Sequence, residues 1–130
     1  MKTSLRIASI LMFLHTIGHT MGALTWKKAP NPVVQKVVDD METNHFDFMN
    51  HQVSLGSFFD GFGFTMIGVL LLVTIMLWLI PERRFTLLIG LFLLFMGIIE
   101  LIYFFPFAAA FSLLAAIFTL YAFIQWKPSN

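Results

Sequence analysis

Long apolar stretches dominate the chain, and four of them are long enough to cross a lipid bilayer. The hydrocarbon core of a bilayer is about 30 Å thick and needs about 20 apolar residues per helix. The four stretches are residues 5–24, 58–80, 85–103 and 107–124. Small residues recur in them at helical rather than alternating spacing, which favours helices over strands. The pattern predicts an all-α, integral membrane four-helix bundle that occupies residues 1–130 as a single transmembrane domain.

The third and fourth predicted helices each carry a face of small or polar residues. On the third helix this face consists of Thr86, Gly90, Gly97 and Glu100. On the fourth it consists of Ala108, Ser112, Ala115, Ala116 and Thr119. Small residues let membrane helices approach closely. We therefore expect these faces to meet inside the bundle, with short antiparallel connections at residues 81–84 and 104–106.

The connection between the first two predicted helices contains an amphipathic segment at about residues 32–50. Its apolar positions recur at roughly helical spacing and include Val33, Val34, Val37, Val38, Met41, His45, Phe48 and Met49. The opposite side carries Lys36, Asp39, Asp40 and Glu42. This pattern predicts an additional amphipathic helix that lies on the membrane surface. The alternative is a helix that caps the end of the bundle.

Composition supports membrane lipid as the main surrounding of the chain. Apolar residues make up 58% and charged residues 12%, whereas a soluble domain has about 45–50% and about 25%. The net charge of +1 gives no electrostatic footprint for nucleic acid, so we expect no nucleic-acid partner. The chain has no cysteine, which excludes disulfides, thiolate metal sites and cysteine nucleophiles.

Basic residues predict how the chain is oriented in the cell membrane. With four spans, both termini and the middle turn lie on one side, which holds five basic residues: Lys2, Arg6, Arg83, Arg84 and Lys127. The other side holds Lys27, Lys28 and Lys36, together with four acidic residues. The excess of Lys and Arg favours a multi-pass protein with both termini in the cytoplasm.

Four ionisable residues lie within the apolar stretches, where such groups are costly and usually functional. They are His15, His19, Asp60 and Glu100. The two histidines are four residues apart and share one helix face. Glu100 lies about 24 Å from the cytoplasmic end of its helix, and Asp60 lies early in a helix that starts outside. We therefore expect one polar cluster in the outer half of the membrane.

The cluster could perform metal chemistry or proton chemistry. His15, His19 and Glu100 offer three ligands with an open position, which suits a divalent transition metal. Haem bound by one of the histidines is a further option. Alternatively, Glu100, His15 and Asp60 act as acids and bases on a lipophilic small molecule such as a quinone.

Other polar side chains near the cluster are candidates for holding a cofactor or ligand. His45 and His51 lie just above it as lids, and Tyr103 lies one helical turn beyond Glu100. The structural alternative is a hydrogen-bonded knot in which Glu100 bonds an imidazole and holds helices together. In that case the protein is a non-enzymatic interaction or assembly subunit.

The first apolar stretch also suggests a family. The run Arg6-Ile7-Ala8-Ser9-Ile10-Leu11-Met12-Phe13-Leu14, followed by Gly18-His19, resembles the first helix of the DoxX-like family of small four-helix bacterial membrane proteins. Some members are linked to quinone-coupled oxidoreductases, so the resemblance implies a four-helix fold and a redox role.

Taken together, the sequence predicts a small membrane protein with a buried His/Glu site that binds a metal or a lipophilic ligand. The chemistry expected there is redox or proton transfer. Gly90 and Gly97 offer a close-packing face on which a homo-oligomer or a membrane partner subunit could assemble.

Overall fold

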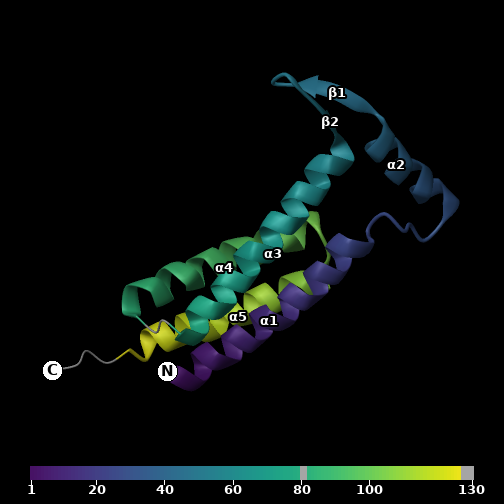
Figure 1. Ribbon diagram of the computed structural model, residues 1–130. Coiled ribbons are helices and arrows are strands. Elements are labelled where there is room, and N and C mark those ends of the chain that lie inside the picture. The colour runs from purple at the N-terminus through teal and green to yellow at the C-terminus, as the bar shows by residue number, and fades with distance from the viewer. Residues whose placement is uncertain (80–81, 127–130) are drawn as a thin grey trace. The chain divides into compact units, whose positions relative to one another are not determined.

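The structure is a computed structural model that describes residues 1–79 and 82–126, and these residues are mostly helical (Figure 1). The elements in chain order are α1 (Lys2–Thr25), α2 (Pro32–Thr43), β1 (His45–Phe48), β2 (His51–Ser54), α3 (Leu55–Leu79), α4 (Arg83–Tyr103) and α5 (Pro106–Ile124). Some of the predictions concern residues outside this description, namely Ile80, Pro81 and Lys127. Ile80 ends the second predicted span, Pro81 begins a predicted connection, and Lys127 is one of the basic residues used for the orientation.

Four of the helices, α1, α3, α4 and α5, are long and apolar enough to cross a membrane. Each begins one to three residues before its predicted start. The start of α4 is fixed by Glu82, whose side chain accepts a hydrogen bond from the backbone N–H of Phe85. At α5, Pro106 occupies the first turn, where its missing N–H costs no hydrogen bond. The prediction of four long apolar helices is confirmed.

The chain divides into two compact units. The first contains residues 1–17 and, within the described residues, 69–79 and 82–126. The second contains residues 18–68. Helices α1 and α3 each belong to both units.

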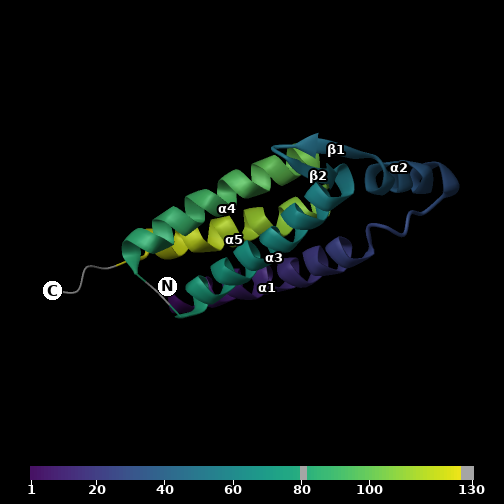
Figure 2. The same cartoon turned by 45° about the horizontal axis from the view of Figure 1, so that its top comes forward.

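In the first unit α4 and α5 run side by side, as Figures 1 and 2 both show. Two glycines of α4 make this approach possible. A Cβ atom on Gly90 would lie 2.6 Å from Cδ2 of Leu120, and one on Gly97 would lie 2.7 Å from Cδ2 of Leu113. The predicted small-residue contact between these helices is confirmed.

The buried face of α5 differs from the prediction at one position. It consists of Ala109, Ser112, Ala115, Ala116, Thr119 and Ala122. Ala108 is only half-buried, because the face follows the 3.6-residue period from Ser112 back to Ala109 rather than to Ala108.

Hydroxyl groups in this unit are mostly bonded within their own helices. Thr16, Thr74 and Thr119 each donate to the carbonyl oxygen four residues earlier, at 2.7–2.9 Å. Ser9 instead donates 2.8 Å across to the carbonyl oxygen of Thr74, which ties α1 to α3. Buried threonine hydroxyls therefore need no partner on another helix.

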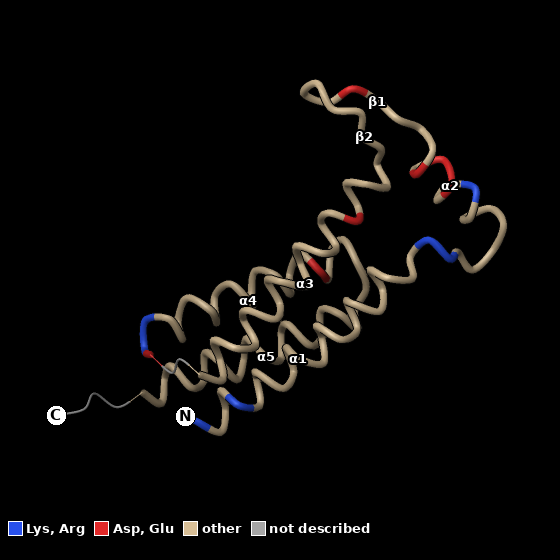
Figure 3. The backbone as a smooth tube through the Cα atoms, in the orientation of Figure 1, with Lys and Arg blue, Asp and Glu red and all other residues tan. Residues whose placement is uncertain are grey.

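The start of α1 and the end of α5 lie at the same end of the first unit. The Met1 amino group donates to Oε1 of Gln125 at 3.0 Å. Basic residues gather there, at the starts of α1 and α4 (Figure 3). The guanidinium of Arg6 lies 5.2 Å from the Trp78 ring, and that of Arg83 lies 4.8 Å from the Phe123 ring.

The second unit contains the amphipathic segment, which is not one helix. Helix α2 covers only Pro32–Thr43, with the Asn31 side chain accepting from the N–H of Val34 at its start. Residues 45–54 form a β-hairpin instead, so the predicted helix over residues 32–50 is wrong in its last third. The reason is an alternation of polar and apolar residues in His45-Phe46-Asp47-Phe48, which is the period of a strand.

Aromatic contacts and a tight turn complete the hairpin. The rings of Phe46 and Phe48 lie 6.3 and 5.5 Å from the ring of Phe58, at the start of α3. Met49 and Asn50 form the two-residue turn with φ angles of 54° and 66°. Positive φ at both central residues matches the right-handed twist of paired strands, so the turn geometry is favourable although neither residue is glycine.

Candidate functional site

The first unit contains a buried ionisable pair, His15 on α1 and Glu100 on α4. Nε2 of His15 lies 3.4 Å from Oε1 of Glu100. Both residues are more than nine-tenths buried. The sequence predicted that an imidazole and a carboxyl group from separate helices meet in the apolar interior, and this pair does so.

A third helix contributes the partner of the other ring nitrogen. Oγ of Ser112 on α5 lies 3.1 Å from Nδ1 of His15, and Ser112 is completely buried. The ring of Phe111 lies 6.1 Å from the imidazole. The imidazole is therefore held between a carboxyl group and a hydroxyl group.

This arrangement can carry a proton in two ways. With a proton on Nε2, His15 donates to the Glu100 carboxylate and its Nδ1 accepts from the Ser112 hydroxyl. With the proton on Glu100, the carboxyl group donates to Nε2, and the Nδ1–H group donates to Ser112 Oγ. The second state holds one proton more than the first. Transfer of the Glu100 proton to Nε2 in that second state gives a carboxylate beside an imidazolium, without any change in helix packing.

One oxygen of the pair is unused. Oε2 of Glu100 is fully buried and has no hydrogen-bond partner in the described part of the chain. A buried carboxyl oxygen without a partner is costly. It marks a position where a proton or a donor group of a ligand would be stabilised.

His19, the other histidine of α1, has a partner in the second unit. Nε2 of His19 donates to the carbonyl oxygen of Gly63 on α3 at 3.1 Å. Within residues 1–79 and 82–126, no group of three or more His, Cys, Asp or Glu residues could hold a metal ion. The predicted metal set of His15, His19 and Glu100 therefore has no support from the geometry.

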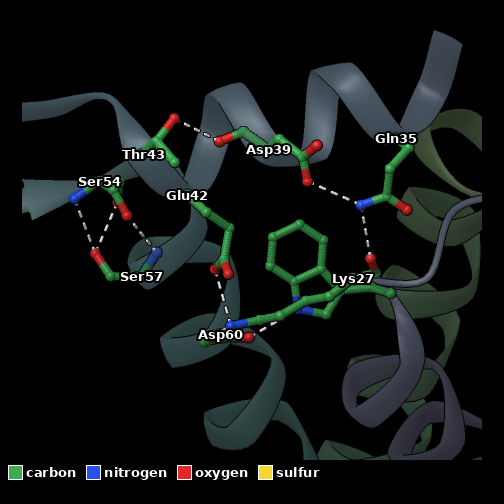
Figure 4. A network of polar contacts seen from close by, with 9 residues as sticks. Lys27, Gln35, Asp39, Glu42, Thr43, Ser54, Ser57 and Asp60 are labelled. Atoms are coloured by element: carbon green, nitrogen blue, oxygen red, sulfur yellow. Dashed lines mark hydrogen bonds and ion pairs between the residues drawn. The ribbon is translucent and has the colours of Figure 1, made fainter. Parts of the chain in front are cut away.

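Asp60, predicted as an auxiliary acid, belongs to an ion-pair network in the second unit (Figure 4). Its Oδ2 lies 2.9 Å from Nζ of Lys27, and its Oδ1 accepts from Nε1 of Trp26 at 2.7 Å. Lys27 also binds Oε1 of Glu42, on α2, at 2.8 Å. Both carboxylate oxygens of Asp60 thus have partners, and Lys27 links the end of α1 to α2 and α3.

The network depends on a glycine and affects the titration of its lysine. A Cβ atom on Gly56 would lie 2.8 Å from Oε1 of Glu42, so glycine leaves room for that carboxylate beside α3. Hydrogen bonds to Glu42 and then Asp60 raise the pKa of Lys27 above its ordinary value. Lys27 therefore keeps its charge at a higher pH than a free lysine does.

The residues predicted to hold a cofactor are exposed. Nδ1 of His45 donates to the carbonyl oxygen of Thr43 at 2.9 Å. His51 pairs with Phe48 at the end of the hairpin, and Tyr103 is 73% exposed at the end of α4. Their predicted role as lids or ligand contacts stays a prediction.

The sequence analysis did not identify two side chains that contact the candidate site residues, Ser112 and Lys27. Ser112 was assigned to a packing face. Among the buried residues of α5, only Ser112 and Thr119 have a polar side chain, and all the others are alanine. Lys27 was used only as one of the basic residues that predict the membrane orientation. Its position directly after one span, with Asp60 early in the next, was the available signal for an ion pair.

Comparisons of the chain with protein-family models, with curated proteins and with solved structures find no match. The DoxX-like resemblance therefore stays a prediction.

Proposed function

We propose that the chain is a multi-pass membrane protein whose buried His15–Glu100 pair binds a small lipophilic ligand and moves a proton. The membrane placement is supported by large apolar side chains that point outward along the four long helices, such as Phe95, Ile102 and Ile117, each more than 60% exposed. In water this surface would be strongly unfavourable, whereas a bilayer covers it.

The proposed orientation places both termini in the cytoplasm. It is supported by the basic groups that gather at the end of the first unit, where Lys2, Arg6, Arg83 and Arg84 lie. Lys and Arg near span ends favour the cytoplasmic side.

We further place α2 on the outer membrane surface. Val33, Val34 and Val37 are all exposed, and α2 follows the end of α1 after only six residues. An amphipathic helix with exposed valines beside a span is well placed to bury them at the headgroup boundary.

The contact of His15 with Glu100 carries the functional proposal. A ligand hydroxyl or carbonyl group of the quinone class would bond the unused oxygen of Glu100, and the proton would pass between Glu100 and His15. Ser112 holds the imidazole in register by bonding Nδ1. Such preorganised polar groups in an apolar surrounding are what proton transfer to a lipophilic ligand requires.

Infrared difference spectra of the full chain in lipid vesicles, recorded as the pH is changed, test this proposal. We expect the carbonyl band of a protonated carboxyl group that disappears in Glu100→Gln. The titration midpoint of this band should shift in His15→Gln. Addition of a short-chain quinone should shift the frequency of the band. Asp47→Asn, which changes an exposed carboxylate on β1, is the matched control and should leave the band unchanged.

A band that survives Glu100→Gln, or that responds neither to His15→Gln nor to the quinone, would contradict the proposal. In that case the second candidate applies, a structural knot in an assembly subunit. The joining of α1, α4 and α5 by one imidazole favours that role. It predicts that Glu100→Gln loses its helical fold and that no ligand is ever detected.

The metal, haem and DoxX-like redox predictions have a separate check. Metal analysis and an absorption spectrum of the protein purified in detergent would reveal a bound ion or haem. An ion that remains bound in wild type and is lost in His15→Gln would favour metal chemistry over the proton proposal.

A further inference from the structure

A small pocket with two cationic side chains lies at the end of the first unit where the chain begins. It has a volume of about 220 Å³ and is lined by Lys2, Leu5, Arg6, Leu77, Trp78 and Leu79. The pocket is thus formed by the first turns of α1 and the last turn of α3. It is smaller than a drug-sized site of about 300–1,000 Å³, so it suits a headgroup rather than a whole cofactor.

Among the described residues, the cationic groups of this pocket have no acidic partner. No carboxylate within residues 1–79 and 82–126 forms an ion pair with Lys2 or Arg6. The Arg6 guanidinium stands 5.2 Å from the Trp78 ring centre, which is within the range of a cation–π contact. A guanidinium held in this way is suited to bind two phosphate oxygens at once.

The rest of the pocket is apolar. Leu5 and Leu77 are almost fully buried, whereas Trp78 and Leu79 are exposed. An indole beside leucines at the end of a span is typical of the boundary between headgroups and acyl chains. The pocket therefore offers cations to a headgroup and apolar surface to the chains attached to it.

We propose that this pocket binds the phosphate of an anionic phospholipid. A phospholipid, rather than free phosphate, matches the combination of cations, indole and leucines, because only a lipid uses both the charged and the apolar lining. Anionic lipids are attracted to clusters of Lys and Arg next to membrane spans. The proposal rests on the membrane placement of the chain and not on the chemistry of His15 and Glu100.

Native mass spectrometry of the full chain in detergent, with equal amounts of phosphatidylglycerol and phosphatidylcholine, tests the site. We expect the singly lipid-bound protein to favour phosphatidylglycerol by about fivefold or more. Phosphatidylcholine carries the same phosphate, but its ammonium group would meet Lys2 and Arg6. In Arg6→Gln the preference should fall to within about twofold of equality, with an intermediate value in Arg6→Lys because lysine cannot form the bidentate contact.

Arg84→Gln is the matched control, since Arg84 is an exposed cation on the same end but outside the pocket. It should keep the lipid preference of wild type. If Arg6→Gln does not retain wild-type helicity by circular dichroism, the lipid preference of Lys2→Gln tests the site independently. Lys2 is suitable because it is exposed at the helix start.

Three results would overturn the proposal. The first is equal binding of the two lipids by wild type. The second is an equal loss of preference in Arg84→Gln and in the pocket variants. The third is displacement of phosphatidylglycerol by millimolar inorganic phosphate, which would make the pocket a site for free phosphate. The infrared band of the His15–Glu100 pair should be unchanged in Arg6→Gln, so failure here is distinguishable from failure of the proposed function.

Discussion

At the residue scale, two ionisable side chains, His15 and Lys27, each have two polar or charged partners on other elements. His15 lies between Glu100 and Ser112, and Lys27 lies between Glu42 and Asp60. Removing one member of such a set exposes the others to the cost of an unpaired polar group. The two sets differ in exposure: the His15 set is buried, whereas Lys27 is exposed and titrates in contact with solvent.

Alkaline pH should weaken the Lys27 network. Its two acidic partners raise the pKa of Lys27 in the folded state. The stabilisation is therefore complete below the ordinary lysine value of about 10.4 and is lost as pH rises through the higher folded value. Lys27→Arg should keep its charge and retain stability there, because arginine stays protonated above pH of about 12.

The measurement is the thermal midpoint of the full chain in lipid nanodiscs, followed by circular dichroism at neutral and at strongly alkaline pH. Lys28→Arg, next to Lys27 but without an ion pair among the described residues, is the control. If Lys28→Arg protects against alkali as well as Lys27→Arg does, the network is not the cause.

At the element scale, the spans could be predicted closely, whereas the connection could not. The hydropathy of a span is summed over about 20 residues, so one atypical residue hardly changes the predicted bounds of the span. The strands at residues 45–48 and 51–54 are only four residues long, and their alternation is too brief to stand out against the preceding helix. The Phe46 and Phe48 contacts with Phe58 decide that segment, and such tertiary contacts cannot be read from local periodicity.

The same limit applied to the candidate site. The cost of a buried carboxyl group and imidazole made Glu100 and His15 visible in the sequence. The partners of Asp60 and His19 depend on how each helix is rotated about its axis. A rotation of 100° per residue changes which side chains meet, and the sequence gives no value for it.

Adding a methyl group to Gly97 should separate α4 from α5. The new Cβ atom would lie 2.7 Å from Cγ of Leu113 and 3.1 Å from its backbone nitrogen. Gly97→Ala should therefore lower the free energy of unfolding by about 1–3 kcal/mol, the usual cost of overpacking. Unfolding in mixed micelles with increasing denaturing detergent measures the change.

Gly68→Ala on α3 is the matched control, because a Cβ atom there meets nothing within 4 Å. It should be neutral or stabilise the helix by up to about 1 kcal/mol, since alanine is the better helix former. Equal effects at the two positions would mean that close packing of α4 on α5 is unimportant.

At the scale of the whole molecule, the proposed four membrane crossings require the start of α1 and the end of α5 to lie on one side. The hydrogen bond from the Met1 amino group to Gln125 is in keeping with this arrangement. The hairpin of the second unit follows one span and leads directly into the next. In the proposed topology one crossing separates it from the start of α1 and three from the end of α5, and an odd number of crossings puts it on the opposite side from both.

The lack of cysteine makes this topology directly measurable. Single cysteines at Thr3→Cys and Gln52→Cys, both exposed positions, report the two sides. A membrane-impermeant thiol reagent should label Gln52→Cys in intact cells and Thr3→Cys only after the membrane is opened. The unchanged chain should stay unlabelled throughout. Labelling of Thr3→Cys alone in intact cells would invert the orientation, and labelling of both would contradict four spans.

The hydroxyl groups that bond within their own helices have a consequence for how this sequence can drift. Exchange of Thr74 or Thr119 for valine removes a donor whose acceptor carbonyl belongs to the same helix, so this loss breaks no hydrogen bond between helices. Ser9 and Ser112 have no such freedom, because their bonds join different helices. Among descendants of this chain, methyl and hydroxyl should interchange readily at these two threonines, while the two serines stay fixed.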